Sequence, residues 1–515
     1  MTLTAVTPAD PMPSWRRSLD VGVITRTELR DLARSGQEPL GVPVIQDGEA
    51  PPELGLDRDA LRAAGFDGTA GQTLVRHSGP DERPMVAYGV GAAETMDAAA
   101  LRDAAGALAL AVDRQSELTV LLPDVPAVRP EVVAQVMVEG AALARYDFEP
   151  LKREPRCAPL TRLTLVTAAP QAREAASRGA TRGRVLAKAT ALARDLANAP
   201  PNLLTAARMA ECATRLAAAG GLRVEAFDRE ALVALGCGGL LGVNAGSSEP
   251  PRMIKLTYEP ETGNGPPGAG WARLTLVGKG IMYDSGGISL KPSDAVHATM
   301  KNDMSGAAAI LAAMAVLREL DCPTAVTGYL MCTDNMPSGT ATKLGDVLTI
   351  RGGTTVEVIN TDAEGRLVMA DALVLATEEA TDAIVDIATL TGACLRALGA
   401  EIAGVFGNSR PLVDQTLSAA AATGEPAWQL PLAARYRGEL DSDVADIKNM
   451  GGPNGAAIHA ALFLSEFVDE VPWAHIDIAG PAQNDIASGW RPKGCTGFGA
   501  RLLAELATGF QPPGR

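Results

Sequence analysis

The sequence predicts an α/β protein with a smaller N-terminal α/β domain and a larger C-terminal domain. The first observation is the length of 515 residues, which exceeds that of one typical domain. The second is that strand-like runs alternate with Ala-rich helical stretches. This alternation predicts a mixed, largely parallel sheet covered by helices on both faces. The third is a helical stretch at 180–198, stopped by Pro200 and Pro201, which separates two such series.

Residues 1–178 are expected to form the N-terminal α/β domain. Its strands are predicted where β-branched and apolar residues run together between turn residues, and its helices where Ala-rich stretches repeat with helical spacing. The strand-like runs are 20–25, 84–90, 117–123 and 160–167, and the helical stretches lie near 97–113 and 129–145.

Residues 179–200 are expected to form a connecting helix, and residues 201–515 the C-terminal domain. A Gly/Pro-rich stretch at 261–270 predicts a surface loop joining two strands. The predicted strands of this domain are 273–278, 325–333, 356–360, 383–390 and 474–480, and the predicted helices are 303–319, 367–379, 456–469 and 496–507.

Composition narrows the range of partners and compartments. The net charge of −15 disfavours nucleic acid or an anionic membrane as the main partner, because phosphate binding requires clustered Lys and Arg. The seven cysteines form no CxxC pair, which is typical of a reduced, cytoplasmic protein. The N-terminal residues do not resemble a signal peptide, and no apolar run reaches the ~18 residues that span a bilayer.

Polar residues follow several predicted strands directly. Lys279 follows the strand at 273–278, Asp362 and Glu364 follow the strand at 356–360, and Thr389 and Leu390 end the strand at 383–390. In open α/β sheets, ligands bind outside the carboxyl ends of the strands. We therefore expect these side chains to meet at one edge of the sheet.

The stretches 277–292 and 359–367, together with Asp303, supply four carboxylates and two lysines, with an arginine at 366 and no histidine. Four like charges in one place repel each other and lose hydration, and a pair of divalent metal ions would resolve both problems. An extended backbone would direct Asp362 and Glu364 to the same side. Asp303 begins a predicted helix, where a carboxylate is favoured as a cap. A lysine ligand would have to be neutral.

A two-metal site activates water and polarises a carbonyl or phosphoryl oxygen, so the spacing predicts a metal-dependent hydrolase. Lys291 and Arg366 would be fixed positive charges for an oxyanion or a bound anion. Amide and phosphate-ester substrates are not separated by these residues alone.

Seven motifs stand out between residues 190 and 500: RDLANAPPN (194–202), KGIMYDSGGISLKP (279–292), MKNDMSGAA (300–308), NMPSG (335–339), NTDAEGRL (360–367), ATLTGA (388–393) and DIAGPA (477–482). They resemble the motifs of the leucine aminopeptidase (cytosol aminopeptidase) family, and NTDAEGRL is the most specific of them. The resemblance implies a metal-dependent aminopeptidase that cuts the N-terminal bond of short peptides, preferring leucine-like apolar first residues.

The resemblance also implies roles for individual residues of the C-terminal domain, which becomes the catalytic metallopeptidase domain. Lys291 would polarise the scissile carbonyl, and Arg366 would hold a bicarbonate ion that relays a proton. The implied ligands of two divalent ions, most simply Mn or Zn, are Lys279, Asp284, Asp303, Asp362 and Glu364. The implied substrate-binding residues are Met300, Asn360, Ala363, Thr389, Leu390 and Gly392.

Other interpretations of these residues remain open. Arg366 could pair with a nearby carboxylate such as Asp371, and a single Asp or Lys is more often a cap or a surface charge. Because the carboxylates fill the ligand count, we interpret the four histidines (77, 297, 459 and 475) as structural or surface residues.

Two further functions are compatible with these residues, a phosphoesterase using the same metals and an oligomeric DNA-binding protein of the same fold. The acidic balance disfavours the second, because only short basic clusters lie at 26–34 and 173–184. The family resemblance also implies a homohexamer of two stacked trimers.

Overall fold

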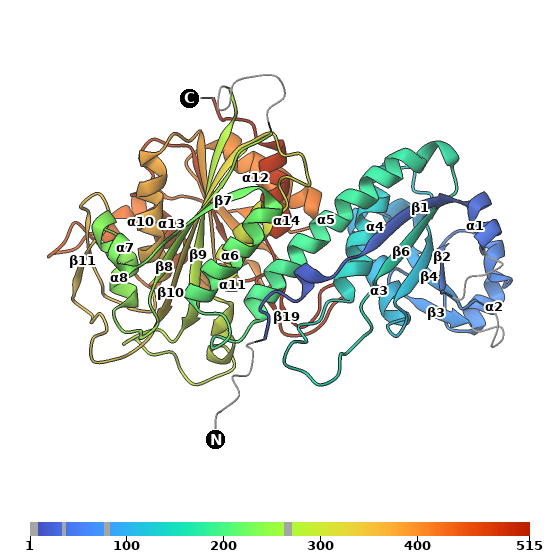
Figure 1. The fold of residues 1–515 in the computed structure, drawn as a ribbon, viewed down its shortest axis with the longest axis horizontal. Coiled ribbons are helices and arrows are strands. Elements are labelled where there is room, and N and C mark those ends of the chain that lie inside the picture. The colour runs from blue at the N-terminus through green and yellow to red at the C-terminus, as the bar shows by residue number, and fades with distance from the viewer. Residues whose placement is uncertain (1–8, 33–37, 77–82, 262–269, 515) are drawn as a thin grey trace. The chain divides into compact units, whose positions relative to one another are not determined.

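The computed structural model describes residues 9–32, 38–76, 83–261 and 270–514 (Figure 1). The chain divides into two compact units, Pro13–Ala191 with Asn484–Gly494, and Leu192–Gln483 with Cys495–Arg515 and the first residues to Met12. The division falls inside helix α5 (Arg173–Asn198), a single helix that includes most of the predicted connector. The domain limits at 178 and 200 stay predictions.

The N-terminal unit is built on a six-stranded sheet in the order β1-β6-β5-β2-β4-β3, parallel throughout except for the β3–β4 pair. Alternate residues face opposite ways: Val120 and Leu165 join a core with helices α3 and α4, whereas Leu121 and Val166 join a second core. The elements are β1 (Asp20–Thr25), α1 (Arg26–Leu32), β2 (Leu40–Ile45), α2 (Arg58–Ala63), β3 (Thr73–Arg76), β4 (Met85–Gly91), α3 (Ala98–Ala111), β5 (Glu117–Leu121), α4 (Pro130–Ala144) and β6 (Arg162–Thr167).

The predicted strands of this unit are present, and the sequence missed two others. Strand β2 contains Pro43, which lacks an N–H for the ladder and argues against an interior strand, yet β2 pairs on both sides. Strand β3 has only four residues, too few to establish an alternating pattern.

The larger unit is built on an eight-stranded mixed sheet in the order β15-β14-β17-β13-β9-β10-β8-β7. Its four central strands, β17, β13, β9 and β10, run parallel to one another, and antiparallel strands flank them. This confirms the predicted fold class. The strands are β7 (Leu222–Phe227), β8 (Arg252–Tyr258), β9 (Arg273–Asp284), β10 (Ala325–Asn335), β13 (Ala383–Ala388), β14 (Ala403–Gly407), β15 (Ala427–Gln429) and β17 (Trp473–Asp477).

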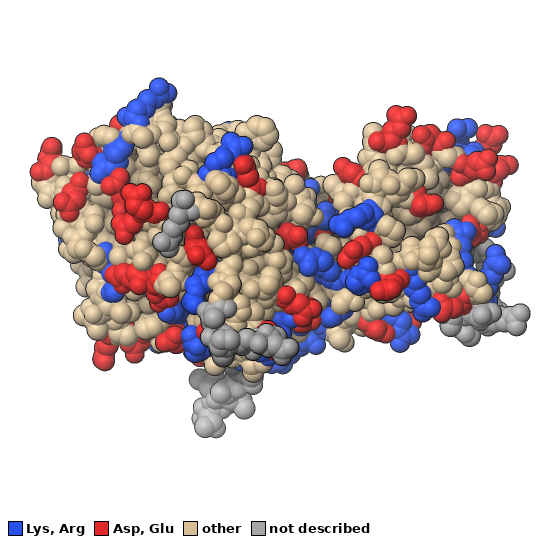
Figure 2. Space-filling view, turned by 90° about the horizontal axis from the view of Figure 1, so that it is seen from above, with Lys and Arg blue, Asp and Glu red and all other residues tan. Residues whose placement is uncertain are grey.

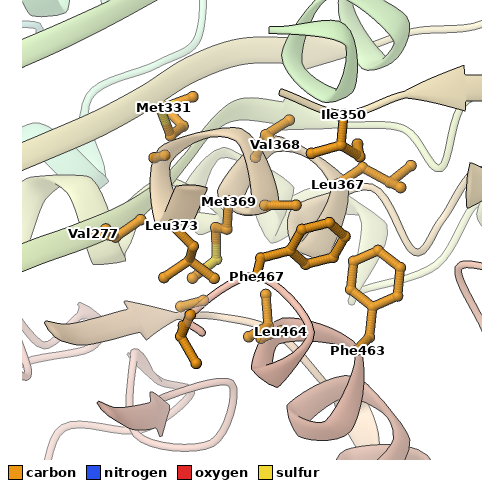
Figure 3. Close-up of a cluster of buried hydrophobic side chains, with 14 of the residues drawn as sticks. Val277, Met331, Ile350, Leu367, Val368, Met369, Leu373, Phe463, Leu464 and Phe467 are labelled. Atoms are coloured by element: carbon orange, nitrogen blue, oxygen red, sulfur yellow. The ribbon is translucent and has the colours of Figure 1, made fainter. Parts of the chain in front are cut away.

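Helices cover both faces of this sheet. On one face, α9 packs against β9 and β10, and all ten of its residues are buried. On the other face, α10 and α13 form a core with alternate sheet residues such as Val277 and Met331 (Figure 3). The helices of the first face are α6 (Ala206–Gly220), α9 (Ser305–Met314), α12 (Arg410–Thr423) and α14 (Ala500–Gly509), and those of the second are α8 (Gly238–Asn244), α10 (Gly365–Glu378) and α13 (Ala456–Ser465).

The predicted strand at 356–360 does not belong to the main sheet. It is strand β12 (Thr355–Glu357), which pairs with β11 (Val347–Thr349) and β16 (Ile447–Lys448) in a separate three-stranded sheet. Strands β11 and β12 form an antiparallel hairpin. No helical crossover leads into β12, as it would if β12 were the next parallel strand of the main sheet. Most of the predicted 261–270 loop lies outside the described residues.

All seven cysteines are buried and free. No helix among the described residues combines the length and apolar character needed to cross a membrane. On the face shown in Figure 2, acidic side chains lie among the basic ones, so this face presents no purely basic stripe of the kind that binds nucleic acid.

We predict that Leu373→Ala destabilises the larger unit by about 2–5 kcal/mol, the usual range for a buried leucine truncated to alanine. Leu373 is fully buried on α10, in the core shown in Figure 3. Chemical denaturation followed by fluorescence measures the loss. The matched control is Leu344→Ala at a site that is 52% exposed, where a change within about 0.5 kcal/mol is expected. Equal losses for the two variants would contradict the assigned core.

Candidate metal centre and its pocket

The carboxyl ends of the four parallel central strands deliver polar residues to one edge of the sheet. Asp284 ends β9, Asn335 ends β10, Asp477 ends β17, and Thr389 directly follows β13. Because parallel strands place their carboxyl ends together, residues far apart in the chain become neighbours here.

A pocket of about 420 Å³ lies at this edge. All thirteen residues singled out in the sequence line it, and the chemical role of each stays a proposal. They are Lys279, Asp284, Lys291, Met300, Asp303, Asn360, Asp362, Ala363, Glu364, Arg366, Thr389, Leu390 and Gly392. Residues not predicted from the sequence also line the pocket, among them Val296, Leu395, Arg396, Met450, Ala456 and His459.

Lys279 is the most enclosed cation of the pocket, with 3% of its surface exposed. Its Nζ lies 2.9 Å from Asp303 Oδ2 and 2.8 Å from Glu364 Oε1, and it donates to the Thr389 carbonyl oxygen at 2.9 Å. Gly365 makes room for this side chain, since a Cβ at that position would lie 2.6 Å from Lys279 Cε. The glycine after Glu364 is therefore required by close approach.

The charges around Lys279 depend on one another. Burial favours its neutral amine, but the negative charges of Asp303, Glu364 and Asp284 outweigh burial and raise the pKa of Lys279 above its ordinary value. Burial raises the pKa of Asp303 and, together with the negative charge of Asp284, the pKa of Glu364. Lys279 is thus held in its charged form by its carboxylate neighbours, whereas burial favours the neutral forms of Asp303 and Glu364.

Lys291 forms a second cationic centre. Its Nζ lies 2.8 Å from Asp284 Oδ2 and 2.5 Å from Asp362 Oδ1. Burial again opposes the charge, and Asp284 and Asp362 outweigh it, so the pKa of Lys291 is raised. The backbone N–H of Gly286 donates to Asp284 Oδ1 at 2.9 Å, in a turn where Gly286 has a φ of +87°. That left-handed backbone favours glycine.

Asp362 and Glu364 reach the pocket by a turn and not by an extended strand. Asp362 lies in the turn, and Glu364 has helical backbone angles (φ −79°, ψ −34°) at the start of α10. The condition of an extended backbone is therefore not met, because the strand ends at Glu357 and the chain turns into α10. Even so, Asp284, Asp362 and Glu364 each offer an oxygen, all within 4.8 Å of one another.

The prediction that Asp303 caps a helix is also wrong. Met304 precedes α9, and no side chain caps that helix. Asp303 turns inward, where its Oδ1 accepts from Thr389 Oγ1 at 2.7 Å and its Oδ2 faces Lys279. Glu364 Oε2 is buried without a hydrogen-bond partner, and Asp303 Oδ2 has the Lys279 ammonium as its only partner. A buried carboxylate oxygen that lacks a donor is consistent with a cation-binding site.

Arg366 is buried, and Nη1 donates to the backbone carbonyl of Asn449 at 2.8 Å, while its buried Nε has no hydrogen-bond partner. Burial lowers the pKa of Arg366 to about 10. The alternative pairing with Asp371 is not observed, because that carboxylate accepts the backbone N–H groups of Leu240 and Arg351. Arg366 thus retains donors for an anion.

Two buried asparagines that the sequence did not single out hold the site together. Asn335 Nδ2 donates to Asp284 Oδ1 and to the Thr361 carbonyl, both at 2.9 Å. Asn449 accepts from the Ile359 N–H at 2.9 Å and donates to the Asn360 carbonyl at 2.7 Å. Together they fix the turn that carries Asp362.

Asp477 plays a similar part on the other side of the pocket. Its carboxylate accepts from Leu390 N–H at 3.3 Å and from Thr391 Oγ1 at 2.7 Å, which fixes the segment after β13. Asn335 and Asp477 both end parallel strands, so the rule that drew attention to Lys279 and Thr389 applies to them too. Asn449 follows a strand of two residues, and no sequence signal marks it.

The histidines occupy different environments. His475 is buried and pairs with Asp386, and the ring of His297 lies 5.9 Å from that of Tyr283. His459 lines the pocket, although its Nε2 is directed to Glu439 Oε2 at 3.3 Å. His77 lies outside the described residues. None of the three described histidines contacts the carboxylates of the pocket through a hydrogen bond or ion pair.

Comparison with known proteins relates both halves of the chain to one family. A model described as the cytosol aminopeptidase family, catalytic domain, matches residues 191–504, and one described as the N-terminal domain of the same family matches residues 55–155. A probable cytosol aminopeptidase of Streptomyces avermitilis is 44% identical over 87% of this chain and 88% of its own. One of Solibacter usitatus is 40% identical over 93% and 98%.

The fold of the chain also resembles that of solved structures. The bottromycin maturation enzyme BotP in complex with Mn has a TM-score of 0.83 and 37% identity, covering 92% of this chain and 99% of that one. A second structure of BotP gives a TM-score of 0.81 at the same identity and coverage. None of these likenesses supports the DNA-binding alternative. The chain belongs to the cytosol aminopeptidase family, a family of metal-dependent aminopeptidases.

Proposed function

We propose that the protein hydrolyses the N-terminal bond of short peptides, preferring leucine-like apolar first residues, with two divalent metal ions bound in the pocket at the strand ends. The observation that carries the proposal is the convergence of four carboxylates and Lys279 around one pocket, with Glu364 Oε2 buried and lacking a hydrogen-bond partner. The family likeness supports the choice of a peptide bond over a phosphate ester.

The residues present fit a pair of divalent cations. Two lysine ammonium groups lie where positive charge is needed, each bracketed by two carboxylates: Lys279 by Asp303 and Glu364, and Lys291 by Asp284 and Asp362. Oxygen-rich sites with one amine accept Mn, Zn and related ions. The proposed ligands are Lys279, Asp284, Asp303, Asp362 and Glu364.

Bound divalent ions would supply a water of lowered pKa and would polarise the scissile carbonyl. Lys291 has 17% of its side chain exposed, so its ammonium can donate to an oxyanion developing on the substrate. The buried guanidinium of Arg366 fits a small planar anion, and we propose bicarbonate there as the group that accepts and returns a proton. Both side chains hold fixed positive charge in a partly dehydrated pocket.

The apolar part of the pocket supports a preference for an apolar first residue. Met300, Leu390, Met450 and Ala456 line the same pocket as the carboxylates. Burial of one further methylene in such a pocket is worth roughly tenfold in selectivity.

We further propose a cytoplasmic homohexamer of two stacked trimers. Trp428 and Val444 are 66% and 67% exposed, and such large apolar side chains are available for subunit contacts. Light scattering checks the assembly: about six times the chain mass is expected, and a stable monomer would contradict it.

We predict that Glu364→Ala abolishes hydrolysis of leucine p-nitroanilide and lowers metal affinity, because it removes a buried carboxylate of the site. Activity of the wild type should disappear after chelation and return with Mn or Zn. Metal content and binding are followed by calorimetry. A wild-type protein that is folded and metal-loaded but inactive would contradict the proposed function.

Lys291→Met is the companion variant for that experiment. Because Lys291 is proposed to act on the substrate and not as a ligand, the variant should bind metal about as well as wild type. Its kcat should fall about 10²–10³-fold, the usual effect of removing one oxyanion donor. A variant with unchanged kcat would remove Lys291 from the mechanism.

We predict that Asn449→Ala lowers metal affinity about 10–100-fold, as expected for a group that orients proposed ligands without contacting the metal itself. The loss arises because the turn at 359–363 loses its side-chain hydrogen bonds. The control is Asn408→Ala, which removes comparable bonds to Val471 and Trp473 away from the pocket. That variant should lose stability only, and equal metal affinity in the two variants would refute the positioning role.

A further inference from the structure

Arg396 is a cation of the pocket that the proposed chemistry does not use. It lies on α11 (Gly392–Leu398), lines the same pocket and is exposed. The other cations are engaged: Lys279 and Lys291 by carboxylates, and Arg366 by the Asn449 carbonyl. In the described part of the chain, Arg396 is assigned no ion pair or hydrogen bond.

The position of Arg396 is fixed by the framework of the site. Thr391 caps α11 by accepting from the Cys394 N–H at 3.0 Å, and Asp477 holds Thr391 Oγ1 at 2.7 Å. The start of α11 is therefore tied to the end of β17. A helix held in this way presents its side chains to the pocket in a defined direction.

The guanidinium lies over Gly392. A Cβ on Gly392 would lie 3.3 Å from Arg396 Nη1, so the arginine occupies the space directly above this glycine. Gly392 is among the residues proposed to line the pocket for the first substrate residue. Leu390 and Met300, proposed to contact the same substrate residue, line this pocket together with Arg396.

We propose that Arg396 is a specificity-determining residue that pairs with the side-chain carboxylate of a peptide beginning with glutamate. The inference rests on the proposed function and deepens it. Glutamate carries two methylenes that suit the apolar residues of the pocket and a carboxylate that matches the planar fork of a guanidinium. The protein would thus accept an acidic first residue beside leucine-like ones and would disfavour lysine there.

Two other roles for Arg396 make different predictions. A cation in the last turn of a helix complements the helix dipole, which affects stability but not the choice between substrates. Alternatively, the guanidinium would bind the C-terminal carboxylate of a dipeptide, which affects peptide length preference but not the first residue. Both alternatives can be separated from the proposal by ratios of rates.

The test compares kcat/KM for the p-nitroanilides of glutamate, glutamine, leucine and lysine, using the metal-loaded full chain. Arg396→Met should lower the glutamate-to-leucine ratio about fivefold, the size of an exposed ion pair, with glutamine changing less. Arg396→Glu should raise the lysine-to-leucine ratio by a similar factor, and Arg396→Lys should restore part of the glutamate preference. Arg410→Met, an exposed arginine outside the pocket, is the control and should change neither ratio.

Unchanged ratios in all Arg396 variants, with leucine p-nitroanilide still hydrolysed, would overturn this inference alone. A change confined to the ratio of Leu-Gly to Leu-Gly amide would also overturn it, in favour of the C-terminal carboxylate. If metal-loaded wild type hydrolyses none of these substrates, the proposed function fails first, and this inference falls with it.

Discussion

The burial of charge at Lys279 is the constraint on which the rest of the site depends. A buried ammonium is costly unless it is paired and hydrogen-bonded, and here Asp303, Glu364 and the Thr389 carbonyl meet all three of its donors. Those partners are buried in turn, so each would be destabilised by the loss of the others. The fold must therefore bring β9, β13, α10 and the segment before α9 together to within hydrogen-bonding distance.

The larger unit meets this demand with two kinds of scaffold. The parallel strands deliver Asp284, Asn335, Thr389 and Asp477 at a single edge, where the sheet itself sets their spacing. The turn bearing Asp362 instead follows a strand of the small separate sheet, so pairing within the main sheet does not fix its position. Hydrogen bonds from Asn335 and Asn449 replace that register, which explains why two neutral amides are buried beside so many charges.

The site residues that can be predicted from the sequence either lie at the carboxyl end of a predicted strand or belong to a motif. The meeting of Lys279 and Thr389 was predicted from their places after buried strands. Thr389 does follow β13, but the place predicted for Lys279 is wrong, because β9 continues to Asp284 and Lys279 lies within it. Asp303 was misread as a cap because its neighbours in sequence are helical, whereas the demand of Lys279 for a second carboxylate decides its direction. Asn449 could not be found, because its role exists only through contacts with residues about ninety positions away.

The fold, too, could be predicted only in part from the sequence. The alternation of strands and helices predicted the mixed sheet, since each strand of that series is long enough to show its pattern. Strand β12 was assigned to the wrong sheet because a run of apolar residues carries no information on which neighbour it will pair with. Residues Asn484–Gly494 group with the N-terminal unit, and no composition shift marks them in the sequence.

Lys279 and Lys291 differ in burial, and this difference gives the two lysines different roles. Lys279 has 4% of its side chain exposed, and each of its donors already has an acceptor, so it has no donor left for the substrate, and its proposed role is that of a metal ligand after loss of a proton. Lys291 has 17% exposed and faces the open part of the pocket, so its ammonium can turn from Asp362 to a substrate oxygen. The ammonium that pairs with Asp284 and Asp362 would thus become available to the substrate when other cations neutralise these two carboxylates. On this argument Lys291 is a group that exchanges partners during function, whereas Lys279 keeps its place.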